Sequence, residues 1–245
     1  MEDDALTYCK NCESEIVKNY CQECGQKASV NQVTFKETID DFIESVFSIN
    51  APLFKTLKYL IVNPGALFNN FLLGKRKRYY KPVAFFVLTT IIYLLIRSLI
   101  GFDPLMDTSV SVNSDDEMMV LARENMLMNS NNFLFLFVFS LSVFLKLFFY
   151  KTYALAEFVV VSFYIVGIYT LLITINLFFI QFVNAEFQAI AFIFMAVYFI
   201  YAMITFLKIP KILIVIKATI LFFLATAVYQ ILAFLISYLI VFIKN

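Results

Sequence analysis

The sequence predicts an all-α integral membrane helical bundle of about five transmembrane helices with a small N-terminal zinc ribbon. Of the 245 residues, 62% are hydrophobic and 15% are charged, and the mean hydropathy is +0.83. Soluble domains are about 45 to 50% apolar and about 25% charged, so this composition excludes an ordinary water-soluble domain. All four cysteines lie in a polar N-terminal part, and long apolar runs follow from Pro82 onward.

Residues 1–30 form the first predicted unit, and their cysteines have the spacing of a zinc ribbon. Two C-x-x-C pairs are separated by eight residues. Each pair can present two thiolates to one ion, so two pairs complete a tetrahedral site. Such a closed site holds a structural ion, because no coordination position stays open for a substrate. The predicted structural zinc ligands are Cys9, Cys12, Cys21 and Cys24.

Two other uses of these cysteines remain open at this point. A redox-active C-x-x-C pair normally begins a helix that follows a strand, and disulfides need an oxidising compartment. A head of about 25 residues is too small to fold around a core of its own. Because structural zinc contributes roughly 10 to 16 kcal/mol of apparent binding free energy, we favour zinc.

Residues 31–81 are predicted to hold short amphipathic or interfacial helices. A capping box begins a helix with one apolar face over Thr34–Phe47. Two shorter helices are expected over Leu53–Val62 and Ala66–Leu73, separated by a turn at Asn63-Pro64-Gly65. Their apolar runs are too short to span a bilayer, so they should lie in the interface or pack against the bundle.

A basic cluster directly precedes the first predicted span. Basic residues in this position attract anionic lipid at about 1 kcal/mol each, and neighbouring tyrosines suit the headgroup region. The cluster could also serve only to fix the topology. Nucleic acid is not favoured, because the sequence offers no element that would read a groove. The predicted headgroup-binding residues are Lys75, Arg76, Lys77, Arg78 and Lys81.

Residues 82–245 are predicted to form the five-span bundle. A hydrocarbon core of about 30 Å needs about 20 helical residues, and five apolar runs approach this length. The second run is the weakest, because Lys146 interrupts it near one end. The predicted spans are Pro82–Leu99, Asn132–Tyr150, Glu157–Phe182, Phe187–Leu207 and Lys217–Ile243.

Lysine and arginine residues set the predicted orientation, because cytoplasmic loops are enriched in both. Eleven of the nineteen basic residues precede the first span, whereas residues 103–131 carry six acidic residues and one arginine. We therefore predict a cytoplasmic N-terminus, an extracytoplasmic acidic segment and an outside C-terminus. A capping box at Ser114–Glu117 predicts a short surface helix within the acidic segment.

Several of these motifs together resemble those of a bacterial membrane-protein family. They are the C-x-x-C-x8-C-x-x-C-G-Q head, Thr56, Asn63-Pro64-Gly65, Gly74-Lys75-Arg76 and Tyr80-Lys81-Pro82. That family pairs a zinc ribbon with several spans and is catalogued only as a domain of unknown function. The resemblance implies a multi-pass protein of the bacterial cytoplasmic (inner) membrane and implies no activity. Five spans with a cytoplasmic N-terminus also resemble Yip-type trafficking proteins, which is a likeness of fold alone.

The residue content narrows the function. The chain has no histidine, which excludes Ser-His-Asp and Cys-His nucleophile systems and His-ligated metals. The sequence also shows no paired carboxylates and no phosphate-binding glycine loop, so we expect no enzymatic activity.

Two functional classes then remain. The first is a membrane scaffold or regulator whose ribbon docks an unknown cytoplasmic protein. The alternative is a transporter or channel subunit for a small solute or lipid. Ion-coupled carriers usually place charges near the bilayer midplane, whereas Arg97, Lys146, Glu157 and Lys217 fall near predicted span ends, so we favour the scaffold. A homo-oligomer is compatible with both.

Overall fold

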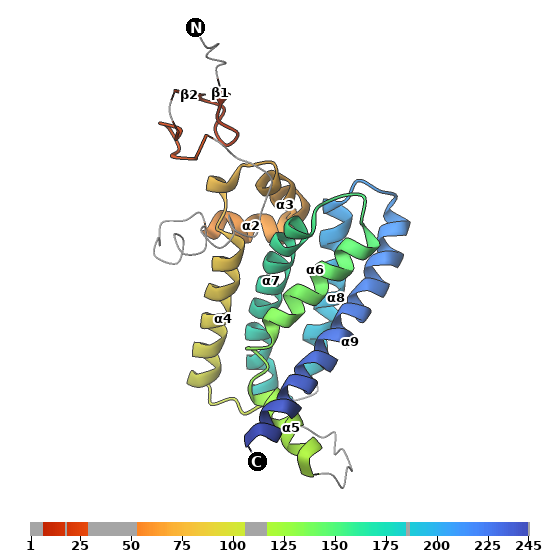
Figure 1. Cartoon of the computed structure of the whole chain (residues 1–245). Coiled ribbons are helices and arrows are strands. Elements are labelled where there is room, and N and C mark those ends of the chain that lie inside the picture. Colours follow the sequence, from red (N-terminus) through yellow and green to blue (C-terminus); the bar gives the residue numbers. More distant parts are fainter. Residues whose placement is uncertain (1–6, 18, 29–52, 106–116, 185–186, 245) are drawn as a thin grey trace.

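The computed structural model describes residues 7–17, 19–28, 53–105, 117–184 and 187–244. In these ranges a small ribbon lies at one end of a bundle of long helices (Figure 1). The helix predicted over Thr34–Phe47 lies outside the described residues. The helical elements are α2 (Leu53–Val62), α3 (Pro64–Leu72), the 3-10 turn η1 (Arg76–Arg78), α4 (Pro82–Leu99), α5 (Glu117–Met128), α6 (Leu134–Phe148), α7 (Leu155–Phe182), α8 (Gln188–Phe206) and α9 (Lys211–Lys244).

Four helices of the described chain are long and apolar enough to cross a membrane, namely α4, α7, α8 and α9. They correspond to the first, third, fourth and fifth predicted spans. The longest is α9, whose 34 residues extend over about 51 Å. It begins at Lys211, earlier than the predicted Lys217, because the carbonyl of Pro210 accepts the N–H of Ile214 at 3.2 Å and a proline suits a helix start.

The second predicted span, Asn132–Tyr150, contains the shorter helix α6. Its 15 residues extend over about 22 Å, which is less than a hydrocarbon core of about 30 Å. Lys146 helps to end the helix, because its Nζ donates to the carbonyls of Tyr150 and Tyr153 at 2.8 and 2.9 Å. A count of five spans is therefore not confirmed, although α6 packs against α7 and α9.

Helix α7 lies at the centre of the bundle, in contact with α4, α6 and α8. Its most apolar stretch is 72% buried inside the protein, compared with 28% to 33% for the other three long helices. Gly167 lets α4 approach closely, because a Cβ at this position would lie 2.7 Å from the ring of Phe85. The outer helices therefore turn much of their apolar surface outward, as expected for helices that face lipid.

Helices α2 and α3 lie across the ribbon end of the bundle (Figure 1). The helix α2 has its predicted bounds, whereas α3 begins at Pro64 and not at Ala66. Asn63 caps α3, because its Oδ1 accepts the N–H of Ala66 at 3.1 Å, and Pro64 occupies the first helical turn. The predicted turn at Asn63-Pro64-Gly65 is therefore the start of the second helix.

Residues of α8 and of the connection between α6 and α7 hold this helix pair in place. Thr205 accepts the N–H of Gly65 on its Oγ1 at 3.1 Å, and the hydroxyl of Tyr198 donates to the carbonyl of Leu60 at 3.1 Å. Asn69 donates to the carbonyl of Phe206 at 3.3 Å and accepts from the hydroxyl of Tyr153 at 2.9 Å. The pair therefore packs against the bundle through one face, as one of the two predicted arrangements requires.

The start of α4 is fixed by two hydrogen bonds to the backbone of Tyr80. Its N–H donates to Oγ1 of the buried Thr56 at 2.7 Å, and its carbonyl accepts from the hydroxyl of Tyr164. The next residue but one, Pro82, occupies the first turn of α4, where the missing N–H costs nothing. The basic residues before α4 are therefore held at a defined place at the bundle end.

Helix α5 lies at the opposite end, against the C-terminal part of α9 (Figure 1). It extends from Glu117 to Met128, which agrees with the short helix expected in the acidic segment, although Ser114 lies outside the described residues. Ala122 is fully buried. Arg97, in the last turn of α4, donates to the carbonyl of Met128 at 3.5 Å.

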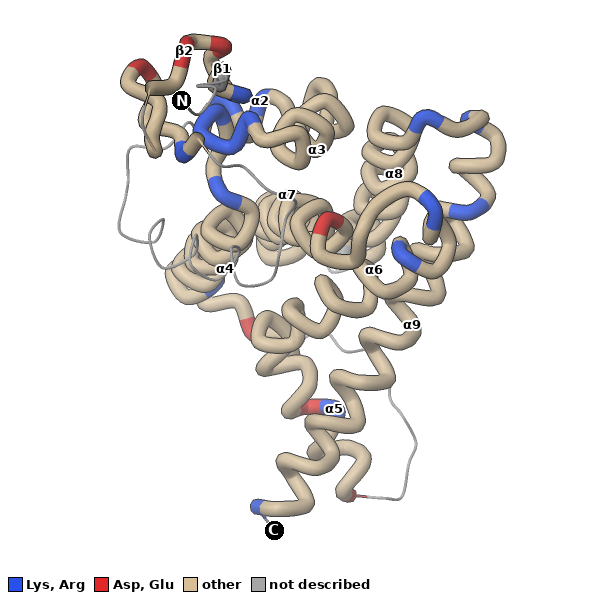
Figure 2. Tube along the Cα trace, turned by 45° about the horizontal axis from the view of Figure 1, so that its top comes forward, with Lys and Arg blue, Asp and Glu red and all other residues tan. Residues whose placement is uncertain are grey.

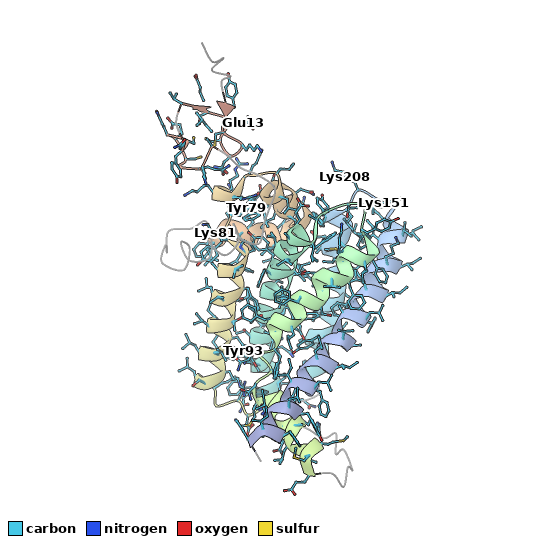
Figure 3. All side chains as sticks on the ribbon, viewed as in Figure 1. Glu13, Tyr79, Lys81, Tyr93, Lys151 and Lys208 are labelled. Atoms are coloured by element: carbon cyan, nitrogen blue, oxygen red, sulfur yellow. The ribbon has the colours of Figure 1, made fainter. Side chains whose placement is uncertain are left out.

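Basic residues of the described chain gather at the ribbon end (Figure 2). They lie in α2, in η1 and near the connections from α6 to α7 and from α8 to α9, where Lys151 and Lys208 are labelled in Figure 3. Tyr93 lies toward the other end of α4 (Figure 3). The connections that the sequence predicts on one side of the membrane are therefore at one end of the bundle.

Candidate metal centre

The ribbon consists of two hairpins, each of which carries one C-x-x-C pair. In the first, β1 (Thr7–Tyr8) pairs antiparallel with β2 (Glu15–Ile16). In the second, Tyr20 forms an antiparallel bridge with Lys27. The two cysteine pairs lie in the turns of these hairpins. This position is typical of zinc knuckles and differs from the helix start at which a redox pair is expected.

The two turns have the same pattern of backbone hydrogen bonds. Cys9 donates its N–H to the carbonyl of Ser14 at 2.9 Å, and Cys21 donates to the carbonyl of Gln26 at 2.7 Å. The residue after each pair has a left-handed backbone, with φ of 66° at Glu13 and 68° at Gly25. A glycine takes this conformation without steric cost, so Gly25 was a sequence signal for the turn and Glu13 was not.

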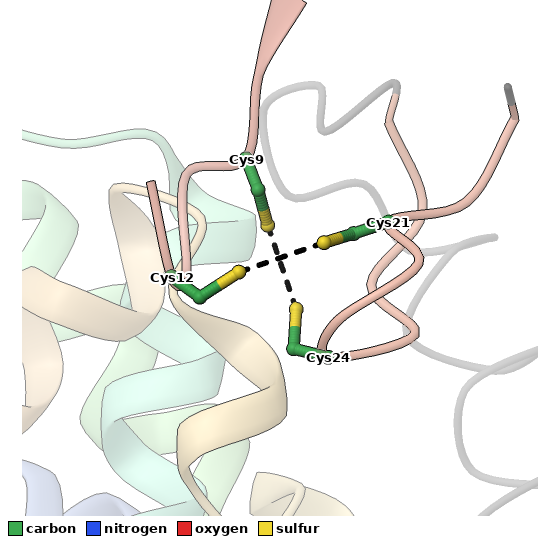
Figure 4. A group of neighbouring side chains, drawn as sticks. All are labelled: Cys9, Cys12, Cys21 and Cys24. Carbon is green, nitrogen blue, oxygen red and sulfur yellow. Dashed lines mark hydrogen bonds between the residues drawn. The ribbon is translucent and has the colours of Figure 1, made fainter. Parts of the chain in front are cut away.

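The four sulfurs converge on one point (Figure 4). All four Sγ atoms lie within 4.8 Å of one another, and the Cys9–Cys24 and Cys12–Cys21 pairs are 3.5 Å apart. Zinc–sulfur bonds of about 2.3 Å in a tetrahedron place sulfurs about 3.8 Å apart. A disulfide needs about 2.05 Å, so none joins these cysteines. The arrangement can hold a metal ion with all four predicted ligands.

The thiols differ in their acidity. Hydrogen bonding from the side chain of Ser14 lowers the pKa of Cys12 and is the largest cause that lowers the pKa of Cys21 to about 6. Burial raises the pKa of Cys24 to about 11. At neutral pH Cys21 is therefore largely a thiolate, whereas Cys24 keeps its proton until a cation displaces it. Binding of a divalent ion should release protons.

Ser14 is a residue of this centre that the sequence reasoning did not identify. Its Oγ lies 2.9 Å from the Sγ of Cys12 and 3.2 Å from the Sγ of Cys21. It follows Cys12 by two positions, in the first turn, and a hydroxyl there has no motif that marks it. Partners of this kind orient ligands and stabilise their charge.

We expect Ser14→Ala to weaken metal binding without abolishing it. The substitution removes a hydroxyl that lies within hydrogen-bond distance of two ligand sulfurs and can donate to one of them, but it leaves all four ligands in place, so affinity should fall by about 10-fold to 100-fold. Competition with a metal chelator, followed by a metal-sensitive dye, measures this change. An affinity equal to that of the wild type would show that the hydroxyl does not support the ligands.

The predicted headgroup-binding cluster separates into two groups. Lys75 lies 3.9 Å from Glu13 of the ribbon through its Nζ, and Arg76 lies over the ring of Phe71 at 5.9 Å. Lys77 and Arg78 are exposed. The fifth residue, Lys81, precedes α4 as its N-cap and is half-buried (Figure 3). The side chains of Lys75 and Arg76 thus contact the protein itself, whereas those of Lys77 and Arg78 are exposed to solvent.

The ribbon contacts this cluster through Gln26. Its Nε2 donates to the carbonyl of Gly74 at 2.6 Å, and its Oε1 accepts the N–H of Lys77 at 3.4 Å. Gln26 closes the second metal knuckle through its own carbonyl. The sequence reasoning noted this glutamine only as part of the C-G-Q motif and gave it no role.

Comparison with known proteins identifies one family model, described as a protein of unknown function (DUF3667), which matches residues 51–94. The match covers α2, α3, η1 and most of α4, and it therefore includes Thr56, Asn63-Pro64-Gly65 and the basic cluster. No curated protein matches the chain. No solved structure matches it either. The zinc identity of the ribbon's ion, the bacterial origin and the likeness to Yip-type proteins stay predictions.

Proposed function

We propose that this chain is a non-enzymatic membrane scaffold or regulator that docks a cytoplasmic protein through its metal-bearing ribbon. The observation that carries the proposal is the convergence of the four sulfurs in a head that lies beyond the apolar bundle. A metal in such a site stabilises a small folded surface outside the membrane. Recognition of a partner is the role to which such a surface is suited.

We infer that the ion is zinc and that it is structural. Four thiolates in a tetrahedral arrangement favour zinc over harder cations, which prefer oxygen ligands. All four ligands come from one short segment, so no coordination position is left for a substrate. A reducing cytoplasm keeps these thiols available for the ion.

The proposed membrane arrangement has five spans, a cytoplasmic N-terminus and an outside C-terminus in a bacterial cytoplasmic membrane. Basic residues at the ribbon end, and the acidic residues Glu117 and Glu124 of α5 at the other end, support this orientation. The short helix α6 is the second span of this arrangement. The turns that flank it must lie in protein or in the interface, because backbone exposed to lipid would lose its hydrogen bonds.

The proposed docking face lies on the ribbon. Tyr8, Val17 and Tyr20 are 61%, 73% and 61% exposed, so the ribbon offers three apolar side chains to a partner. An open hollow is lined by Asn19, Tyr20, Cys21 and Gln22. Exposed tyrosines beside a polar rim are typical of protein interfaces.

We also propose that the bundle end contacts anionic lipid. Helix α2 exposes Phe54, Ile61 and Val62 beside Lys55 and Lys58, which combines apolar and basic side chains on one short helix. Such a helix suits the membrane interface. The exposed basic residues of η1, Lys77 and Arg78, lie at the same end and would add electrostatic attraction to headgroups.

Transport is not the function that we propose. Three charged side chains of α6, α7 and α9 that could serve a coupling ion are instead hydrogen-bonded to the backbone between Phe148 and Ala154. Lys217 donates to the carbonyl of Phe148 at 3.3 Å, and Glu157 accepts the N–H of Ala154 at 2.7 Å. Lys146 donates to two carbonyls after α6.

The test is a cross-linking pulldown from native membranes with a Tyr8→Ser, Val17→Ser, Tyr20→Ser variant. Removal of the apolar face should reduce the captured partner at least about tenfold, because interface tyrosines commonly contribute more than 1 kcal/mol each. The matched control is Tyr150→Ser, which removes an equally exposed tyrosine on the bundle at 61%. Metal content is measured in every sample. Equal partners and amounts in the two variants would contradict docking by the ribbon.

A further inference from the structure

We infer that the ion in the ribbon controls the basic loop before α4 through Gln26, which acts as a positioning residue. The basic loop is defined here as residues 74–78. This inference rests on the proposed metal site, because it assigns that site a regulatory consequence. It concerns the side of the ribbon that contacts residues 74–77 of the bundle end, whereas partner docking concerns the exposed face.

Gln26 is the side chain that joins the two parts. It is 4% exposed, although it lies in a small head outside the bundle. Both ends of its amide are used, since Nε2 donates to the carbonyl of Gly74 and Oε1 accepts the N–H of Lys77. A buried amide satisfied on both ends fixes an orientation, because loss of either partner leaves a buried polar group unpaired.

The metal knuckle determines where Gln26 lies. Its carbonyl accepts the N–H of Cys21 at 2.7 Å, and the N–H of the preceding Gly25 donates to the carbonyl of Cys21 at 2.9 Å. These bonds form the turn that presents Cys21 and Cys24 to the ion. A ribbon of this size holds its turns only with the ion bound, so the position of Gln26 depends on the metal.

The first knuckle makes a second contact with the same loop. Glu13 has the left-handed backbone of that turn, and its Oε1 lies 3.9 Å from Nζ of Lys75. The Glu13 side chain is 83% exposed, so this ion pair contributes little by itself. Each knuckle nevertheless directs one side chain to the loop, and the four thiolates around a divalent cation add negative charge beside it.

The far side of the loop is held by the bundle independently of the ribbon. The hydroxyl of Tyr79 accepts from Nδ2 of Asn70 at 3.1 Å, and the backbone of Tyr80 is bonded to Thr56 and Tyr164. The near side of the loop is also held, because the N–H groups of Gly74 and Lys75 donate to the carbonyls of Phe71 and Asn70 at 3.1 and 2.9 Å. Metal loss should therefore release residues 76–78 while both flanks of the loop and α4 keep their positions. Because Lys77 and Arg78 belong to the released part, the metal state sets how these basic side chains are presented.

Hydrogen–deuterium exchange of the full chain in lipid nanodiscs tests the inference. Zinc-loaded and chelator-stripped samples are compared, with metal content measured in each. Stripping should raise exchange in the peptide that covers residues 74–78 at least about tenfold, because it frees the N–H of Lys77, while α4 stays unchanged.

Two variants separate the effect of the Gln26 side chain on loop exchange from the effect of the ion. Gln26→Leu keeps the volume but removes both hydrogen bonds, so the zinc-loaded variant should exchange in the loop as the stripped wild type does. Gln22→Ala changes an exposed glutamine of the same ribbon and should match the loaded wild type.

The outcomes distinguish the two proposals. Zinc bound in the wild type with equal loop exchange before and after stripping would overturn the inference and leave the metal site intact. Gln26→Leu with bound zinc and wild-type protection would also overturn it. Failure of the wild type to bind zinc would overturn the metal site and this inference together.

Discussion

Cys21→Ser is expected to abolish metal binding and to unfold the ribbon while the bundle stays folded. The substitution removes one of four ligands, and a structural zinc site contributes roughly 10 to 16 kcal/mol of apparent binding free energy. The ribbon cannot replace this contribution, because its buried apolar residues are few and form a cluster separate from that of the bundle. Loss of the ion should therefore expose the backbone of residues 7–28.

Elemental analysis and hydrogen–deuterium exchange of the purified chain measure both parts of this expectation. The wild type should carry one zinc ion per chain and Cys21→Ser none, with fast exchange in the ribbon and in the basic loop while the bundle helices stay protected. Gln22→Ala, which alters the next residue and no ligand, is the matched control and should keep both ion and protection. A ribbon that stays protected without the ion would show that the fold does not depend on metal.

Gly65→Ala is expected to be among the most destabilising single-methyl additions in the bundle. A Cβ at this position would overlap the backbone carbonyl of Thr205 and the backbone nitrogen of Phe206. Backbone atoms cannot rotate away, so α3 must move from α8 and the hydrogen bond from Gly65 to Thr205 must break. We expect the free energy of unfolding to fall by about 3 kcal/mol or more.

Thermal unfolding of the detergent-purified chain, followed by loss of helical circular dichroism, measures this effect. Gly167→Ala is the control, since its Cβ would come closest to the side-chain ring of Phe85 at 2.7 Å, whereas the Cβ at Gly65 would overlap backbone atoms. It should lower the melting temperature less than Gly65→Ala. Equal melting temperatures for the two variants would contradict close packing of α3 on α8.

Much of the candidate site could be predicted because its signals are local. The two C-x-x-C pairs specify their own turns, and the sulfurs meet as their spacing predicts. Ser14 was missed because a serine near a ligand has no distinguishing pattern in sequence. Glu13 was missed because the left-handed position after the first pair is normally marked by glycine, and here it is not.

The helices were predictable where long apolar runs exceed the width of a bilayer. Those runs gave α4, α7, α8 and α9 close to their observed bounds. A fifth span is not confirmed, because α6 is shorter than the bilayer core although the apolar run continues into its flanking turns at Phe133 and Phe149. An apolar run indicates that a segment is buried away from water, but it does not indicate the residue at which the helical hydrogen bonds end.

The amino-acid order alone determined that the chain is helical, apolar enough for membranes and equipped with four thiols for one ion. These properties follow from composition and from spacing within a few residues. Only the tertiary structure decided that Gln26 meets Gly74, that Gly65 meets Thr205 and that the basic connections share one end. Such contacts join residues 48 and 140 positions apart, and their partners are selected by packing geometry, which no local pattern encodes.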